Sequence, residues 1–160
     1  GLEPRGYGLG RTEVPPGAFA LDAATVTAVP IRHTAQSLGY RVTTAAGSVA
    51  FFGDADTCDE LVLLARGTDL FVCDCAMPDG EKIDGHLTPS LAAAHAERAG
   101  ARRLLLTHFY PACEGHDLAG AAAAHYGGEV LLAEDLQVLP IGARGFSGSP
   151  PADDGSPRGP

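Results

Sequence analysis

The chain has few basic residues, no C-x-x-C cysteine pair and no long apolar run. Only 11 of its 160 residues are Lys or Arg, against 20 Asp or Glu, which gives a formal net charge of -9. Nucleic-acid affinity comes largely from basic side chains that displace counterions from phosphates, so a broad nucleic-acid-binding surface is disfavoured. We therefore expect a substrate that is small or held locally.

The four cysteines form no C-x-x-C pair. Cys73 and Cys75 fall on the same face of an expected strand, which is poor geometry for a zinc finger or a disulfide framework. We interpret all four as reduced thiols of a cytoplasmic protein. No segment reaches the roughly 18 apolar residues that span a bilayer, and residues 1–10 lack the apolar core of a signal peptide. Neither membrane insertion nor export is therefore expected.

Both ends of the chain are rich in turn-forming residues. Residues 1–20 contain the turn signal Pro15-Pro16-Gly17 and are predicted to be a loop or a severed connection. Because Met77 is the sole methionine, we expect that part of the translation product lies upstream. Residues 141–160 are dominated by Gly, Ser, Pro and Asp and are predicted to be a disordered tail. Residues 21–140 then form one domain, since a composition that is 45% apolar can bury one ordinary core.

The central region predicts an α/β protein. Short β-like runs come first, the second and third joined as a hairpin across 45–47, and strands then alternate with helices. We predict a mixed sheet with helices packed on one face, as in half of a layered α/β domain. The predicted strands are 25–32, 40–44, 48–52, 69–73, 103–106, 130–133 and 136–139. The predicted helices are 57–66, starting at a Thr57/Glu60 capping box, 88–98, starting at Thr88-Pro89, and 117–126.

Three polar side chains follow predicted strands, at positions where a rigid sheet can hold metal ligands and leave a coordination position open. They are His33, Asp54 and His108, in a chain with only six histidines. Imidazole and carboxylate are good zinc ligands, and a carboxylate can bridge two ions, so Asp54 is the natural candidate to link two metals. The hypothesis is a hydrolytic site in which metal-bound hydroxide is the nucleophile.

His86 precedes a predicted helix N-terminus, a setting in which a side chain and backbone N–H groups can meet an oxyanion or a phosphate. It suits a general acid or a group that stabilises the transition state. The alternative for each of these residues is a structural histidine or carboxylate that is hydrogen-bonded within the fold. The remaining candidates are interpreted as structural: Asp56 as a helix cap, Asp74 and Asp79 as strand-end or loop carboxylates, and His95 and His125 as surface residues, while His116 is ambiguous.

Together these segments resemble the C-terminal half of the metallo-β-lactamase superfamily, and most closely its ribonuclease Z-like hydrolases. The similarity runs from about Val26 to Pro111. It rests on an ordered series of segments: Val29-Pro30-Ile31-Arg32-His33 followed by Ser37-Leu38-Gly39-Tyr40-Arg41, then Ala50-Phe51-Phe52-Gly53-Asp54, Gly85-His86-Leu87-Thr88 and Leu106-Thr107-His108-Phe109.

The resemblance implies an αββα sandwich, of which this chain is mainly the second half, and a site for two zinc ions. It implies that His33 binds the first zinc, Asp54 bridges both, His108 binds the second, and His86 assists at the scissile phosphate or leaving group. The His-x-His-x-Asp-His motif that precedes these segments in the family is absent, since no histidine precedes His33.

This departure has two expected consequences. Three ligands shared between two ions give each ion at most two protein donors, so we expect the chain alone to bind zinc weakly and to be inactive. One sheet face should also lie uncovered, unless the missing N-terminal half or a homo-oligomer partner covers it.

Three functions stay open on the sequence, and with them the question whether this chain is itself an enzyme. The first is the C-terminal part of a zinc-dependent hydrolase that cleaves a phosphodiester or a related ester, with RNA as one option. The second is a non-catalytic, degenerate or truncated relative that acts as a binding or assembly module. The third is a lactamase or thioester hydrolase on the same fold.

Overall fold

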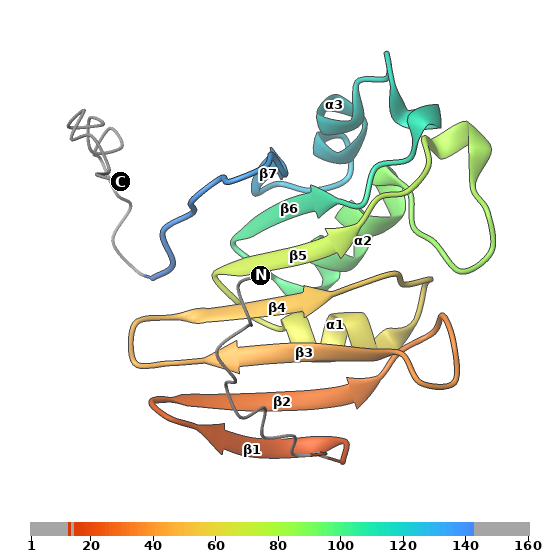
Figure 1. Ribbon diagram of the computed structural model, residues 1–160. Helices are drawn as coiled ribbons and strands as arrows, with labels where there is room; N and C mark the ends of the chain where they lie inside the picture. Colours follow the sequence, from red (N-terminus) through yellow and green to blue (C-terminus); the bar gives the residue numbers. More distant parts are fainter. Residues whose placement is uncertain (1–12, 14, 143–160) are drawn as a thin grey trace, which may run out of the picture.

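The computed structural model describes residue 13 and residues 15–142, and within them one seven-stranded sheet carries three α-helices (Figure 1). The strands lie side by side in chain order. They are β1 (Gly17–Leu21), β2 (Ala24–Pro30), β3 (Leu38–Thr43), β4 (Ser48–Phe52), β5 (Leu70–Asp74), β6 (Arg103–Thr107) and β7 (Glu129–Leu132). The helices are α1 (Asp59–Ala65), α2 (Pro89–Ala99) and α3 (Leu118–Ala123), with two short 3-10 helices, η1 (Asp79–Glu81) and η2 (Pro111–Cys113). The predicted α/β class is confirmed.

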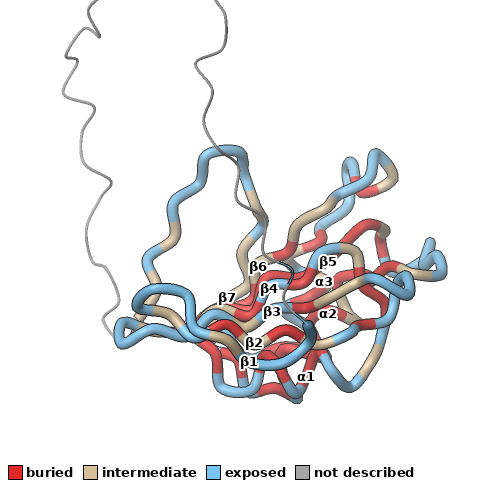
Figure 2. Tube along the Cα trace, turned by 60° about the horizontal axis from the view of Figure 1, so that its bottom comes forward, coloured by how far each residue is buried: buried red, intermediate tan, exposed pale blue. Residues whose placement is uncertain are grey.

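The sheet has an antiparallel half and a parallel half. Strands β1 to β4 form a meander in which each strand runs opposite to the one before it. Strands β4 to β7 are parallel, and a helix connects each to the next. The helices pack on the same face of the sheet (Figures 1 and 2), as successive crossovers in one direction require. The carboxyl ends of β2, β4, β5 and β6 therefore meet at one edge.

The hydrophobic core lies between the sheet and the helices. Phe52 and Phe71 are fully buried there and meet edge to face, with ring centroids 5.0 Å apart. Gly39 on β3 makes room for Phe52, because a Cβ at this position would lie 2.6 Å from the Phe52 ring. The alanines of α2 let that helix approach the sheet closely. Ala92, Ala93 and Ala96 are all fully buried, and Figure 2 shows how burial is distributed along the chain.

The opposite face of the sheet is also apolar. Tyr40 lies opposite Phe51 in the β3–β4 register, and Phe51 lies opposite Val72 in the β4–β5 register. These side chains point away from the helices because their strand neighbours, such as Phe52 and Phe71, fill the core. Phe51 is 49% exposed, and none of the described helices packs on this face. We call it the open face; the expectation that a missing N-terminal half or a partner covers it stays a prediction.

Two local predictions at the ends of the domain are wrong. The segment 17–20, predicted as loop, is most of strand β1, because Gly17–Leu21 pairs along its whole length with β2. The turn at Asp22, whose φ is 49°, closes this hairpin tightly. The predicted strand 136–139 does not form, because Leu136 and Val138 are 99% and 89% exposed beyond the edge strand β7. Residues 1–12 and the predicted tail beyond residue 142 lie outside the described residues.

The helices begin and end close to the predicted residues, with two exceptions. Helix α1 begins after Cys58 without a side-chain cap, so the predicted Thr57/Glu60 capping box is wrong. Helix α3 stops at Ala123, three residues before the predicted end at Tyr126. Helix α2 follows Thr88 and has Pro89 at its first position, as predicted; it ends at Ala99, one residue beyond the predicted end, and Gly100 after it is in the left-handed conformation.

Two further sequence expectations concern the surroundings of the protein. In the part of the chain that the structure describes, no helix combines the length and the apolar character needed to cross a bilayer. All four cysteines are free, and Cys73, Cys75 and Cys113 are buried. Burial raises the pKa of the Cys75 thiol to about 12, so this side chain is a neutral thiol. The cytoplasmic location stays a prediction.

Candidate metal centre

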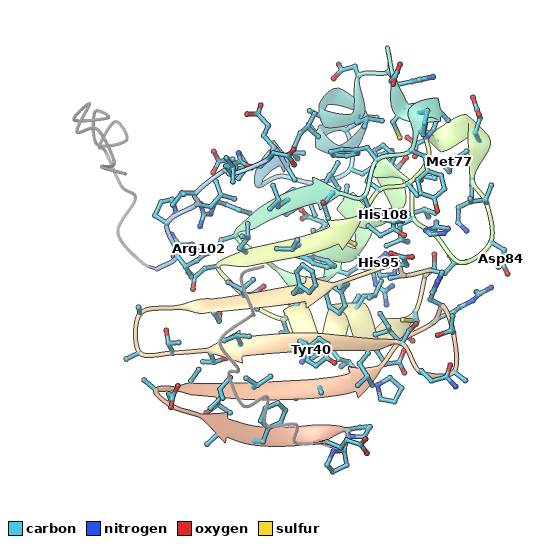
Figure 3. The ribbon with its side chains drawn as sticks, viewed as in Figure 1. Tyr40, Met77, Asp84, His95, Arg102 and His108 are labelled. Carbon is cyan, nitrogen blue, oxygen red and sulfur yellow. The ribbon has the colours of Figure 1, made fainter. Side chains whose placement is uncertain are left out.

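The edge of the sheet where β2, β4 and β6 end carries the four residues singled out in the sequence. His33 follows β2, Asp54 lies two residues beyond β4, and His108, which is labelled in Figure 3, directly follows β6. His86 comes from the loop between η1 and α2. Because these strands are parallel to one another, their following loops meet although up to 75 residues separate them in sequence.

Asp54 lies at the centre of this cluster. Its Oδ1 is 3.4 Å from His108 Nε2, and its Oδ2 is 3.7 Å from His33 Nε2. Each carboxylate oxygen therefore faces a different imidazole, which is the arrangement that a carboxylate bridging two ions requires. Asp54, His86 and His108 also offer one ligand atom each within 4.8 Å of one another. The structure thus brings together all four residues that the sequence predicted.

Hydrogen bonds fix the orientation of two of the imidazoles. His33 Nδ1 donates to the carbonyl oxygen of Gly85 at 2.9 Å, which leaves Nε2 free to face Asp54. His86 Nδ1 contacts Asp74 Oδ2 at 2.9 Å, and this carboxylate is fully buried at the end of β5. Asp74 Oδ2 also accepts from the backbone N–H groups of Ala55 and Leu87. It therefore joins the strand-end loops to His86.

The sequence pattern predicts Asp74 only as a strand-end or loop carboxylate and does not reveal this role. A signal was present, because Asp74 ends a fully buried strand and lies in register with Thr107, the residue before His108. A carboxylate at that position can avoid the cost of burial only by finding partners within the site.

His108 has two features that suit a metal ligand. Its φ is 64°, in the left-handed region that non-glycine residues rarely adopt and that is found at functional sites. Its Nε2 is buried and has no hydrogen-bond partner, so a polar atom is aimed at the cluster without being satisfied. Imidazole nitrogens together with a carboxylate form a donor set that zinc prefers. The residues present therefore fit a divalent metal ion.

Asp56 is not the helix cap that the sequence predicted. Its carboxylate accepts from the Thr57 N–H at 2.7 Å, from the Gly85 N–H at 2.8 Å and from Lys82 Nζ at 3.1 Å. Burial alone would raise the pKa of Asp56, but these hydrogen bonds and the charge of Lys82 outweigh it and lower the pKa to about 2. Asp56 is therefore ionised at neutral pH and ties two loops of the site together.

A pocket of about 390 Å³ connects the cluster with the open face of the sheet. Asp54 and His108 line one end of it, and Phe51, Val72 and Leu105 line the other. The candidate site therefore opens toward an apolar surface. On its other side, the ring of Tyr110 packs against both His86 and His108, with centroids 5.5 and 5.2 Å apart.

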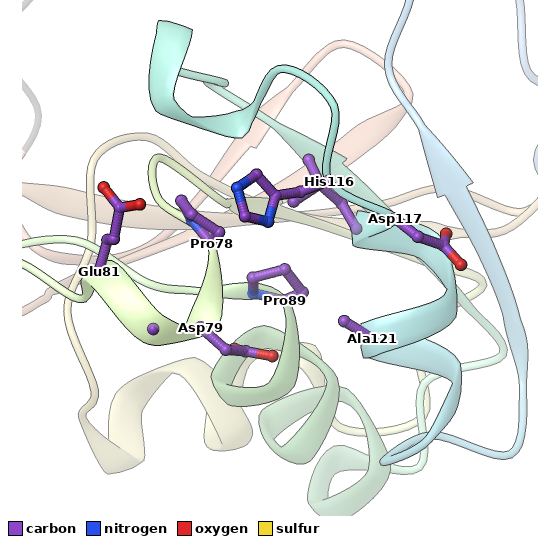
Figure 4. Close-up of a pocket in the computed structure, with 9 residues that line it drawn as sticks. Pro78, Asp79, Glu81, Pro89, His116, Asp117 and Ala121 are labelled. Atoms are coloured by element: carbon purple, nitrogen blue, oxygen red, sulfur yellow. The ribbon is translucent and has the colours of Figure 1, made fainter.

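The other histidines lie away from this cluster. His95 is 3% exposed in α2 and donates to the carbonyl of Leu91, so its predicted surface position is wrong. His125 is exposed, as predicted. His116 lines a separate pocket of about 200 Å³ between η1 and the start of α3, together with Asp79 and Asp117 (Figure 4). None of the four predicted site residues lines that pocket.

Comparisons with known proteins show the family of this chain. The model of the β-lactamase superfamily domain matches residues 5–109. An uncharacterized protein of Mycobacterium tuberculosis is 39% identical over 113 residues, which cover 69% of this chain and 41% of that protein. Ribonuclease Z of Thermobifida fusca is 32% identical over 151 residues, which cover 90% of this chain and 45% of that protein.

A solved structure supports the fold. The metallo-β-lactamase fold protein YhfI of Bacillus subtilis superposes with a TM-score of 0.71 at 24% identity, over 76% of this chain and 50% of that protein. The chain thus spans about half the length of the relatives it matches, or less. With the family model matching well over half of the residues, this chain belongs to the metallo-β-lactamase superfamily and is ribonuclease Z-like.

Proposed function

We propose that this chain is the C-terminal part of a zinc-dependent hydrolase that cleaves a phosphodiester or a related ester. The observation that carries the proposal is the position of Asp54, whose two carboxylate oxygens face His33 and His108 separately. The similarity to ribonuclease Z of Thermobifida fusca favours a phosphodiester, with RNA as one candidate substrate. The acidic composition favours a substrate that is gripped locally rather than along a basic surface.

In this proposal, His33, Asp54 and His108 hold the metal, with two zinc ions expected in the complete domain. Bound zinc lowers the pKa of water and stabilises negative charge on the substrate. His33 presents Nε2 because its Nδ1 donates to Gly85. His86 likewise has Nε2 free, because Nδ1 contacts the buried carboxylate of Asp74, which can stabilise a protonated imidazole. His86 can therefore hold a proton at Nε2 for the leaving oxygen.

Replacement of His86 by alanine tests this assignment in the full-length gene product. Loss of a general acid lowers kcat by about 10²- to 10⁴-fold, and we expect that range for hydrolysis of a phosphodiester with an alcohol leaving group. A substrate whose leaving group is a nitrophenolate needs little protonation, so its kcat should fall much less. Zinc content, measured by atomic absorption, should stay at the wild-type value.

The outcomes separate the roles of His86 and the candidate functions. Equal losses of kcat for both leaving groups, together with lost zinc, would make His86 a ligand instead of an acid. His95→Ala serves as the control, because it removes a histidine that lies outside the cluster. A wild-type protein that binds no zinc and cleaves no ester would favour the non-catalytic binding module, and one that cleaves only β-lactams or thioesters would favour the third function.

We further propose that the open face of the sheet packs against a second layer, either an N-terminal half of the protein or a second copy. The face is apolar, Phe51 on it is 49% exposed, and the pocket at Asp54 opens onto it. The relatives support the proposal, because the match to this chain covers only 41% and 50% of two of them. An exposed apolar patch of this kind is usually covered in a soluble protein.

The 160-residue chain alone is therefore expected to self-associate. Sedimentation velocity should show oligomers whose fraction falls in a Phe51→Ser variant. Leu63→Ser is the matched control, because Leu63 is 61% exposed but lies on α1, in the helix layer on the other side of the sheet. A monomeric wild-type chain with a cooperative melt would contradict the proposal.

A further inference from the structure

We propose that Asp56 is a positioning residue that acts through Gly85 to set the tautomer of His33 and the position of the loop that carries His86. This inference deepens the proposed function, because it concerns the same metal centre. It goes further in assigning a task to a residue whose oxygens take no direct part in the cluster of His33, Asp54 and His108.

The contacts form a continuous path. The Asp56 side chain is 3% exposed, and its Oδ2 accepts from the Gly85 N–H at 2.8 Å. The carbonyl of Gly85 in turn accepts from His33 Nδ1 at 2.9 Å. A carbonyl can only accept, so this contact fixes the proton on Nδ1 and leaves the lone pair of Nε2 facing Asp54, 3.7 Å away.

Glycine is favoured at the middle of this path. Gly85 has a φ of 85°, in the left-handed region, so any side chain there would strain the backbone. A Cβ would also lie 3.1 Å from His33 Nδ1. The positive φ and the close approach of His33 therefore both favour glycine at position 85. Asp56 binds the N–H of Gly85, and the carbonyl of Gly85 binds the His33 ring.

The Asp56 carboxylate also contacts basic side chains from the loop that carries His33 and the loop that carries His86. Lys82, the only lysine of the chain, places Nζ 3.0 Å from Asp56 Oδ1 and also donates to the carbonyl of Ile83. Arg32, the neighbour of His33, lies 3.8 Å from Asp56 Oδ2. With Thr57, Gly85 and Lys82 already bound, the oxygens of Asp56 are occupied by donors. Asp56 is thus suited to orient ligands rather than to be one.

The test uses the full-length gene product labelled with ¹⁵N-histidine. Without metal, long-range ¹H–¹⁵N spectra should show His33 as a single Nδ1–H tautomer in the wild type. In Asp56→Ala this signal should become a mixture of tautomers, and zinc affinity measured by competition with a chromogenic chelator should fall about 10- to 100-fold, as for other outer partners of metal ligands. Neither the tautomer nor the zinc affinity depends on hydrolysis, so this test can succeed or fail independently of the proposed activity.

Three variants complete the design. Asp69→Ala is the control for general destabilisation, because Asp69 binds Ser48 N–H and Arg102 away from the cluster, and His33 should not change in it. Asp56→Asn keeps an acceptor for Gly85 and should retain the wild-type tautomer and a zinc affinity within about threefold. Gly85→Ala should reproduce the Asp56→Ala result, and it replaces that variant if Asp56→Ala does not fold. An unchanged His33 tautomer and zinc affinity in a folded Asp56→Ala or Gly85→Ala protein would overturn the proposal.

Discussion

Replacing Asp54 with alanine is expected to lower the zinc affinity of the full-length gene product by at least about 100-fold, beyond what the loss of an outer partner costs. Asp54 is the one anionic side chain among the four clustered residues, and its oxygens lie 3.4 Å from His108 and 3.7 Å from His33. Its loss removes one carboxylate oxygen ligand beside His33 and another beside His108 at the same time. Calorimetric titration with zinc measures the affinity, and phosphodiester hydrolysis should be lost in parallel.

The folded structure should survive this substitution. Asp54 is partly exposed and makes none of the core contacts, so the free energy of unfolding of the metal-free protein should change by less than about 0.5 kcal/mol. Asp59→Ala is the matched control: it removes a carboxylate at the start of α1 that pairs with Arg98 at the surface, and it should leave zinc binding unchanged. Wild-type zinc affinity in Asp54→Ala would refute the central role assigned to this residue.

The site could be predicted from the sequence where its residues follow strands. His33, Asp54 and His108 come shortly after apolar β-like runs, and parallel strands bring such positions to one edge regardless of their separation in sequence. The local signals for α2 were equally direct, with Thr88-Pro89 before the helix and Gly100 after it. These predictions depended on backbone periodicity and turn chemistry, which act over a few residues.

The residues that support the site could not be predicted in this way. Asp56 contacts Gly85 across 29 positions, and Asp74 contacts His86 across 12, so their partners are set by how the loops pack. The sequence gives each only as an acidic residue near a strand end. Strand β1 escaped prediction for a similar reason, because its short apolar run becomes a strand only by pairing with β2.

Replacing Phe52 with alanine is expected to cause the largest loss of stability, about 3–5 kcal/mol, as for other fully buried aromatic side chains. Phe52 is completely buried and packs edge to face on Phe71 at 5.0 Å. Its ring also packs directly on Gly39, so closely that a Cβ at position 39 would lie 2.6 Å from it. The free energy of unfolding can be measured by urea denaturation of the 160-residue chain at low concentration.

The neighbouring Phe51 is the matched control, since it is the same residue type on the same strand but points to the open face. Because it is 49% exposed, Phe51→Ala should cost less than about 1.5 kcal/mol in the 160-residue chain. Equal costs for the two substitutions would contradict the assignment of core and open face.

In the full-length gene product the comparison also tests whether the open face is covered, because a layer packed on this face would bury Phe51. The cost of Phe51→Ala should then rise toward that of Phe52→Ala, whereas an unchanged cost would mean that this face stays uncovered.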